Sequence, residues 1–225
     1  MKIKIRRAEE RDLLDLLRID AEIWLEFPAT EAMFRSRINV FPEGQLVAEN
    51  LQDGRVFGSV FTQRIDYAEW KDKNFSWNEI TDYGTIKATH QPLGQDLYGV
   101  GLAVEKRFQG SGAATKLMLG IARLILRNNI RDAYTGARMP RYSRHIDMTP
   151  QAYAFWTRDN HPIDPEIYLY FKAGFSVVRV LPNYIKDLKS LNYGALMVKR
   201  NPCGRLSGKF ISLLGERALG KILGR

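Results

Sequence analysis

The spacing of hydrophobic positions divides the first part of the chain into a strand, a helix and a hairpin. The opening KIKIRRA alternates as a half-buried strand does, and between Glu9 and Trp24 the leucines recur at spacings that mostly fit one helical stripe. QLVAEN and VFGSVFTQ are β-prone runs on either side of Asp53-Gly54, a dipeptide that accepts the positive φ values of a tight turn. The pattern predicts a strand, a helix and two antiparallel strands.

Strands and helices continue to alternate in the rest of the chain. The run at 97–104 predicts a strand covered on both faces, and residues 112–128 predict a long helix with a broad apolar face. We then expect a strand at DAYTGAR, helices near 152–157 and 165–172, and final strands at FSVVRVL and YGALMVK.

The two faces of the strand at 97–104 differ in side-chain size. Strict alternation places Tyr98, Val100, Leu102 and Val104 on one face and Leu97, Gly99, Gly101 and Ala103 on the other. The second face is then mostly bare backbone, so we expect a packed helix or a ligand to approach it closely.

An aromatic-rich insertion at 63–96 is too long for a plain connection between strands. Its aromatic residues are Tyr67, Trp70, Phe75, Trp77 and Tyr83. They indicate either a satellite cluster buried under a loop or a lid that faces a substrate.

Composition excludes several protein classes. The chain has 225 residues, of which 45% are apolar and 26% charged, which is typical of one globular domain. A single cysteine, Cys203, cannot form an internal disulfide, and His90, His145 and His161 show no metal-ligand spacing, so we predict no metal. With no apolar run long enough for a membrane span or a leader, we expect a cytoplasmic protein.

The net charge of +9 is concentrated at the C-terminal end. From Lys199 to Arg225 there are seven basic residues and one acidic residue, which leaves +3 for residues 1–198. Because this basic segment has no groove-reading motif, we predict no nucleic-acid partner. Residues 203–225 interleave apolar and basic side chains with glycines, as an amphipathic segment ordered by a surface would. An anionic membrane, an acidic carrier protein, its own domain or a twin subunit in a homodimer are the candidate surfaces.

The junction EKRFQGSGAATKLM joins the strand at 97–104 to the long helix through very small residues. Such a loop leaves unpaired backbone N–H groups at the helix N-terminus, where the helix dipole also favours negative charge. The junction therefore predicts a pyrophosphate site, although it matches neither the P-loop nor the dinucleotide fingerprint.

Gln109, Gly112 and Ala114 resemble the Q/R-x-x-G-x-G/A loop of the GNAT N-acetyltransferases, which binds the coenzyme A pyrophosphate. With FPEGQLVAE, SWNEIT, LYGVGLAV, TGARMPRY and GFSVVRVLPNY, residues 1–202 resemble the GNAT domain associated with nitrilase-type carbon–nitrogen hydrolases. The resemblance implies an α/β GNAT fold, a mixed, mostly antiparallel twisted sheet flanked by helices. Acyl-CoA would lie in a V-shaped opening between the loop strand and the next strand. No hydrolase domain is recognisable beside it.

The resemblance further implies an acyl-CoA-dependent N-acyltransferase that uses acetyl-CoA by default and a small-molecule or carrier-bound amine as acceptor. The implied coenzyme-binding residues are Leu102, Ala103, Val104, Gln109, Gly110, Ser111, Gly112, Ala113, Ala114 and Thr115. Tyr170 in YFKAGF occupies the position of the family's tyrosine that protonates the departing thiolate. The alternative is that Tyr170 is a core aromatic of an amphipathic helix.

The general base is not evident from the sequence. The strand at 97–104 has no carboxylate, and Gly101 stands where a glutamate would be plausible. Glu79, His90 and Tyr98 are substitute candidates, and Arg138 and Tyr142 are candidates for binding an anionic acceptor or the coenzyme phosphates.

The missing carboxylate fits deprotonation by water, an acyl group larger than acetyl over Gly101, or loss of catalysis. A second hypothesis is therefore a non-catalytic acyl-CoA-binding or regulatory partner of a nitrilase-type hydrolase or carrier protein.

Overall fold

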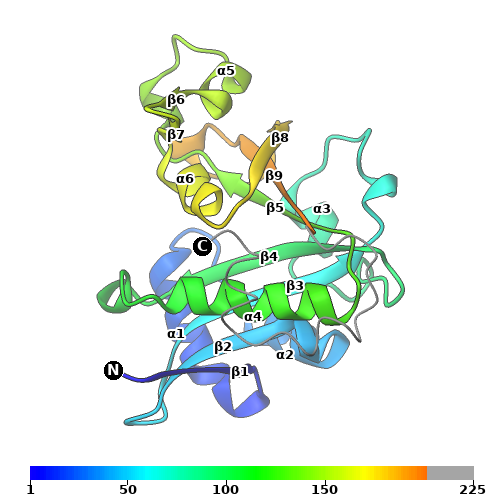
Figure 1. Ribbon diagram of the computed structural model, residues 1–225, viewed down its shortest axis with the longest axis vertical. Helices are drawn as coiled ribbons and strands as arrows, with labels where there is room; N and C mark the ends of the chain where they lie inside the picture. Colours follow the sequence, from blue (N-terminus) through cyan, green and yellow to red (C-terminus); the bar gives the residue numbers. More distant parts are fainter. Residues whose placement is uncertain (202–225) are drawn as a thin grey trace.

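Seven strands form one twisted sheet in the order β1-β2-β3-β4-β5-β9-β8, in a computed structural model that describes residues 1–201 (Figure 1). Every neighbouring pair is antiparallel except β4–β5, which is parallel. The strands of this sheet are β1 (Ile3–Arg7), β2 (Gln45–Asn50), β3 (Val56–Ile65), β4 (Asp96–Val104), β5 (Asp132–Arg138), β8 (Ser176–Leu181) and β9 (Gly194–Arg200). The predicted mixed, mostly antiparallel sheet is confirmed. The basic segment predicted at 203–225 lies outside the described residues.

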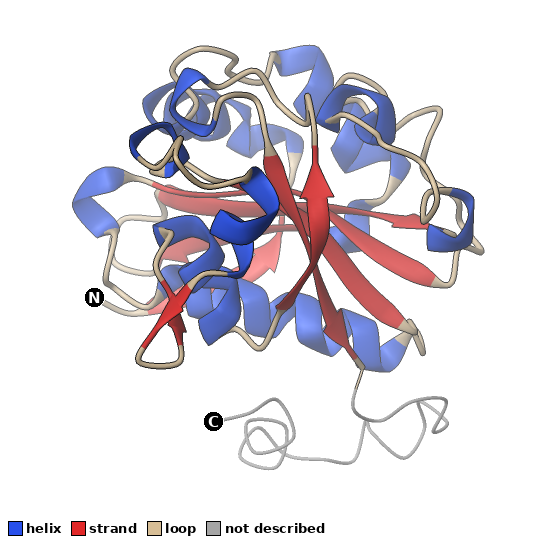
Figure 2. Ribbon diagram, turned by 90° about the horizontal axis from the view of Figure 1, so that it is seen from above, coloured by secondary structure: helices blue, strands red, loops and turns tan. Residues whose placement is uncertain are grey.

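Helices cover both faces of the sheet (Figure 2). They are α1 (Leu13–Ile23), α2 (Glu31–Val40), α3 (Trp77–Thr81), α4 (Ala113–Arg127), α5 (Pro150–Phe155) and α6 (Pro165–Lys172). In Figure 1, α4 lies in front of β2–β4, whereas α1 and α2 lie behind them. No helix within residues 1–201 is long and apolar enough to cross a membrane.

The hairpin predicted around Asp53-Gly54 is confirmed. Strands β2 and β3 pair antiparallel, and Gly54 has φ +72° with its N–H donating to Asn50 O at 2.8 Å. A Cβ at Gly54 would meet no atom within 4 Å, so this left-handed turn lies in open surroundings.

Helices α2 and α3 and a short hairpin were not predicted from the sequence. Helix α2 begins after Thr30, whose hydroxyl accepts the N–H of Met33. The hairpin consists of β6 (Thr157–Arg158) and β7 (His161–Pro162), and it stands outside the main sheet.

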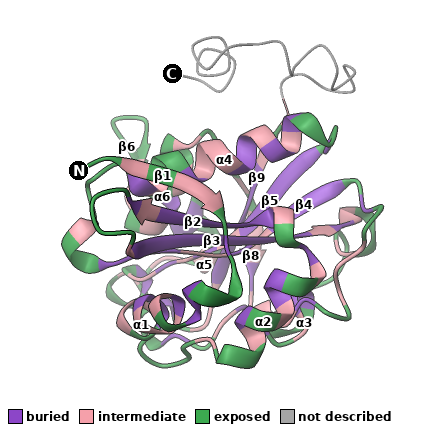
Figure 3. Cartoon of the chain, turned by 90° about the horizontal axis from the view of Figure 1, so that it is seen from below, coloured by how far each residue is buried: buried purple, intermediate pink, exposed green. Residues whose placement is uncertain are grey.

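The core is continuous between α4, the sheet and α1–α2, and the inner strands such as β2 and β3 are its most buried part (Figure 3). Helix α4 presents Leu117, Ile121 and Leu124 to the sheet. Gly120 lets the helix approach β2, because a Cβ there would lie 2.7 Å from Leu46 Cδ1. A second cluster of buried side chains, including Tyr153 and Ile167, lies around β5, β9, α5 and α6.

The aromatic connection between β3 and β4 packs on the main core rather than forming a separate cluster, and part of it lines the cleft. Phe75 is 2% exposed and belongs to the main core, and Tyr67 stacks on Tyr134 with ring centroids 3.8 Å apart. Trp77 and Tyr83 instead line the cleft described below.

Candidate functional site

A cleft opens where β4 and β5 separate. The two strands pair only over Leu97–Gly99 and Ala133–Thr135, whereas β3 continues to pair with β4 as far as Val104. Residues 100–104 therefore have no partner strand on the β5 side. The cleft beside them has a volume of about 1030 Å³, large enough for a cofactor.

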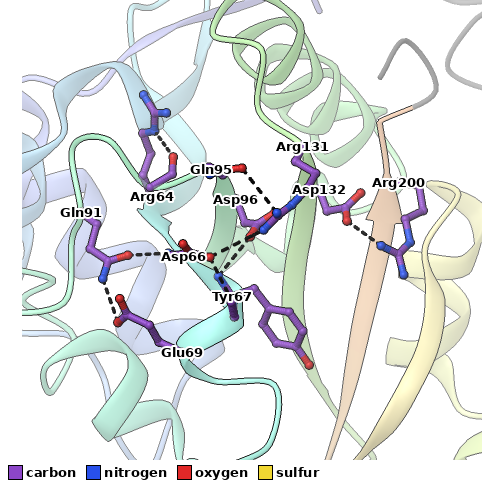
Figure 4. A network of polar contacts seen from close by, with 12 residues as sticks. Arg64, Asp66, Tyr67, Glu69, Gln91, Gln95, Asp96, Arg131, Asp132 and Arg200 are labelled. Atoms are coloured by element: carbon purple, nitrogen blue, oxygen red, sulfur yellow. Dashed lines mark hydrogen bonds and ion pairs between the residues drawn. The ribbon is translucent and has the colours of Figure 1, made fainter. Parts of the chain in front are cut away.

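The gap between β4 and β5 is V-shaped, and a polar network joins the two strands at its closed end, where both strands begin (Figure 4). The Asp96 side chain is fully buried and accepts hydrogen bonds from Arg131 Nε and the Tyr67 N–H, both at 3.0 Å. Arg131 Nη2 also lies 3.6 Å from Asp66 Oδ1. The network ties β4, β5 and the aromatic connection together where the strands still touch.

A β-bulge in β4 changes which residues share a face. Gly101 pairs with Phe61 but Gly99 pairs with Thr62, so Val100 is the extra residue. Paired residues lie on the same face, and Phe61 and Thr62 point to opposite faces. The prediction that Gly99 and Gly101 share one face is therefore wrong, because the bulge shifts the alternation between them.

Gly99 and Gly101 consequently face opposite sides of the sheet. Gly99 packs on the α4 side, where a Cβ would lie 3.0 Å from Thr135 Oγ1. Gly101 faces the α1–α2 side with Phe61, and a Cβ there would meet nothing within 4 Å. The unoccupied space beside Gly101 is thus part of the cleft. Trp77 borders it, with Nε1 donating to Val100 O at 2.8 Å.

The loop before α4 has the geometry of an anion site. Gly110 and Gly112 have φ +83° and +85°, and Gly112 caps the N-terminus of α4. The first helical hydrogen bond runs from Lys116 N to Gly112 O at 3.0 Å. The N–H groups of residues 113–115 precede it and have no partner within the helix, and no acidic residue occupies the first turn.

Nine of the ten predicted coenzyme-binding residues line the cleft; they are Leu102, Ala103, Val104, Gln109, Gly110, Gly112, Ala113, Ala114 and Thr115. The tenth, Ser111, is exposed beside them, with its Oγ 3.4 Å from Ala113 N. Gln109 Nε2 donates to Val104 O at 3.3 Å, which fixes the loop against the strand.

Tyr170, the predicted acid, lines the cleft from α6 at the opening between β4 and β5. Burial raises the pKa of Tyr170 to about 12, and the charge of Glu166 adds to the shift. The phenol therefore stays protonated at neutral pH and can donate a hydrogen bond. Tyr170 also contacts Phe175 edge-on, so it has a packing role as well.

The predicted residue Arg138 lines the same cleft and forms an ion pair with Glu166. Glu166 was not among the predicted site residues. Arg138 Nε donates to Glu166 Oε1 at 2.9 Å, its N–H donates to Oε2 at 3.0 Å, and its guanidinium lies 4.5 Å from the Trp24 ring. Burial raises the pKa of Glu166, while Arg138 opposes the shift. The signal was present in the sequence, because Glu166 and Tyr170 are four residues apart on one helix.

The other predicted acceptor residues do not line the cleft. Glu79 caps α3, and hydrogen bonds from Ser76 lower its pKa. His90 accepts the N–H of Arg64, and burial lowers its pKa. Tyr98 is fully buried with its hydroxyl 2.7 Å from that of Tyr184, and Tyr142 donates to Met148 O.

Two buried charged residues in the cleft were also missed. Asp20 on α1 and Arg37 on α2 are both buried, and both line the cleft. Burial raises the pKa of Asp20, whose carboxylate accepts the N–H of Ala29. No sequence signal marked them, because their place in the cleft depends on how α1 and α2 pack. Residues 1–201 contain no cluster of three or more metal-ligating side chains.

The chain has sequence relatives in Bacillus subtilis (strain 168), although no protein-family model matches it. It is 31% identical over 205 residues to the protein named "Uncharacterized N-acetyltransferase YkwB", covering 88% of this chain and 89% of that one. It is 30% identical over 206 residues to "Probable hydrolase YhcX". That match covers 89% of this chain but only 39% of the length of the relative.

Solved structures show the same fold. The loading GNATL domain of CurA from Lyngbya majuscula superposes with a TM-score of 0.79 at 19% identity, covering 89% of this chain and 98% of that domain. The GphF GNAT-like decarboxylase in complex with isobutyryl-CoA gives 0.72 at 22% identity, covering 88% and 98%.

Proposed function

The chain belongs to the GNAT family of N-acetyltransferases, and from this premise we propose that it transfers an acyl group from coenzyme A to an amine by direct attack on the thioester. One observation carries the proposal. The free edge of β4 at 100–104 runs directly into the amide-rich N-terminus of α4, and both line a single cleft. An extended ligand with a diphosphate fits that combination.

In this proposal the coenzyme lies along the opening of the V. Amides within residues 110–115 bind its diphosphate at a helix N-terminus with no competing carboxylate in the first turn. The N–H of Ser111 is the exception, because it donates to Phe108 O at 3.2 Å. The pantetheine arm pairs with the main chain of Leu102, Ala103 and Val104 as an added strand would. The thioester then reaches the bulge, where the space beside Gly101 accepts acetyl or a larger acyl group.

The reaction needs one bond to form and one to break. The lone pair of the neutral amine attacks the thioester carbonyl carbon, and the carbon–sulfur bond then breaks to release the coenzyme as a thiolate. Tyr170 stabilises the thiolate by donating a hydrogen bond, and a proton that Tyr170 passes to the sulfur is replaced from solvent. Glu166, whose pKa is raised by burial, accepts the amine proton directly or through water.

The activity is tested by following free thiol and acylated amine together. Purified protein is mixed with acetyl-, propionyl- or malonyl-CoA and a panel of amines, and both products are quantified. The proposal predicts thiol and N-acylated product in equal amounts, with a marked loss in Glu166→Gln. Thiol release without acylated amine would contradict it.

A second candidate function is a non-catalytic acyl-CoA-binding partner of a hydrolase. Two observations favour it: the match to part of a larger protein named a probable hydrolase, and the absence of a carboxylate from residues 97–104 of β4. It predicts tight binding of acyl-CoA with no turnover of any thioester.

A further inference from the structure

A buried arginine lies in the cleft on the face opposite α4. Arg37 is 3% exposed, and its Nε donates to Gly84 O at 2.6 Å. Its guanidinium carbon lies 5.3 Å from the ring centroids of both Phe34 and Phe61. Its Nη2 atom is buried and has no hydrogen-bond partner among the described residues.

This guanidinium is incompletely satisfied by the protein. Burial lowers the pKa of Arg37 to about 10, so the side chain is still a cation at neutral pH. Asp20 opposes the shift through its charge, but its carboxylate accepts the N–H of Ala29. Burying a cationic nitrogen without a hydrogen-bond acceptor is costly, so the site is suited to a ligand that supplies one.

Arg37 also lies near the proposed position of the thioester. It packs over Phe61, which is directly paired with Gly101 in the sheet. Paired residues of neighbouring strands are roughly 5 Å apart. The space beside Gly101 is open, and Arg37, Phe61, Gly101, Trp77 and Met33 all line the same cleft.

We propose that Arg37 binds a carboxylate of the acceptor, so that the amine acylated by this chain is an amino acid or another amine that carries a carboxylate. This inference rests on the function proposed above. A carboxylate offers the planar pair of oxygens that a guanidinium binds best. The aromatic walls of Phe61 and Trp77 would shield that ion pair from water, while the amine at the other end of the acceptor reaches the thioester.

The experiment compares matched acceptors that differ only in the carboxylate. Glycine, β-alanine, 4-aminobutyrate and L-leucine are each paired with their carboxamide, and kcat and KM are measured with acetyl-CoA. At a given pH a larger fraction of each carboxamide than of its acid has a neutral amine. Intrinsic reactivity alone would therefore favour the carboxamides, which is the opposite of the prediction. Wild-type protein should nevertheless prefer at least one acid over its amide at least tenfold in kcat/KM.

Variants assign that preference to Arg37. Arg37→Met should raise KM for the preferred acid at least tenfold and leave its amide within about twofold. The matched control is Arg35→Met on the same helix, whose side chain is 44% exposed and paired with Glu10 and Glu31; it should change neither. Affinity for acetyl-CoA, measured by calorimetry, reports folding. If Arg37→Met does not fold, Arg37→Lys is the test variant. It keeps the positive charge but loses the planar pair of nitrogens that binds a carboxylate, so it should raise KM for the acid.

The experiment distinguishes a wrong carboxylate site from a wrong proposed function, because the two give different results. Acylation of amides as fast as acids, or an unchanged acid preference in Arg37→Met, overturns the carboxylate site and leaves the acyltransferase intact. If no amine is acylated, N-acetyl-L-leucine and N-acetyl-L-leucinamide are tested as ligands by thermal shift with coenzyme A present. Binding of the acid alone, lost in Arg37→Met, supports the site, and equal or absent binding overturns it.

Discussion

Tyr170 and Glu166 lie one helical turn apart on α6, and this spacing places the proposed proton donor near a partly buried carboxylate. The carboxylate and the surrounding apolar side chains keep the phenol protonated, so Tyr170 serves as a donor rather than as a base. Its pKa of about 12 is well above that of a thiol near 8.5, so hydrogen bonding to the forming thiolate matters more than full transfer in the transition state.

Tyr170→Phe should lower kcat by about 10²-fold, the lower end of the range for general acid catalysis, and leave acyl-CoA affinity unchanged. Thiol release and calorimetry measure the two quantities. The control is Tyr168→Phe, because Tyr168 is on the same helix but does not line the cleft. An unchanged kcat in Tyr170→Phe would remove the proposed donor role.

The pH profile provides a second readout for the same residue. A phenol with a pKa of about 12 is protonated throughout the neutral and mildly alkaline range, so Tyr170 should cause no fall in kcat below about pH 11. Its contribution should be lost only as the pH passes its pKa. A fall in kcat near pH 9 that is absent from Tyr170→Phe would show that the phenol ionises much more easily.

At the scale of elements, the loop and helix N-terminus from Gly110 to Thr115 form the most specific structure of the cleft. A valine at position 112 would have to adopt φ +85°, which costs about 1–2 kcal/mol for a β-branched residue. Its Cβ would meet no protein atom, so it would occupy the open space that we assign to the diphosphate.

Gly112→Val should therefore raise the dissociation constant of acetyl-CoA at least tenfold by calorimetry. Gly54→Val is the matched control, because Gly54 has φ +72° in equally open surroundings in a hairpin outside the cleft. It should lose similar stability and keep its affinity. Equal affinities of the two variants would mean that the diphosphate does not bind at Gly112.

Most element boundaries were predictable because local chemistry sets them. The turn at Gly54 and the helix after Gly112 both need small residues with positive φ, which the sequence displays directly. Helix α2 was missed although Thr30, Phe34 and Ile38 carry a capping and burial pattern typical of a helix. The bulge at Val100 could not be predicted, because it exists only in the pairing of β4 with β3.

Part of the candidate site could be predicted from the sequence, and part could not. The conformation of the glycine-rich loop before α4 depends on consecutive residues and was predictable, whereas the proposed acceptor side depends on contacts between distant segments. Arg37 bonds to Gly84, 47 residues away, and Glu166 pairs with Arg138, 28 residues away. Neither pairing follows from spacing along the chain, since each requires the packing of separate helices onto the sheet.

At the scale of the whole molecule, the network around Asp96 joins the β1–β4 part of the sheet to the β5–β9–β8 part (Figure 4). The opening of the V depends on this closed end, because β4 and β5 pair over only a few residues. The fully buried Asp96 carboxylate and its partner Arg131 therefore set the geometry of a cleft that lies further along both strands.

Asp96→Ala should lower the free energy of unfolding by about 2–3 kcal/mol, because it leaves Arg131 and the Tyr67 N–H without their shared acceptor; Arg131 is half exposed, which limits the loss. That corresponds to a fall in Tm of roughly 4–12 °C for a chain of this size. The control Asp72→Ala removes a carboxylate that is 85% exposed and should change Tm little. Equal melting of both variants would contradict the role given to the network.

The proposed acyl transfer depends most on where coenzyme A binds, and a crystal structure of the complex measures that directly. We predict that diphosphate oxygens lie about 2.7–3.2 Å from backbone nitrogens of residues 110–115, with the pantetheine arm beside Leu102 to Val104. A diphosphate bound at any other part of the chain would contradict the account.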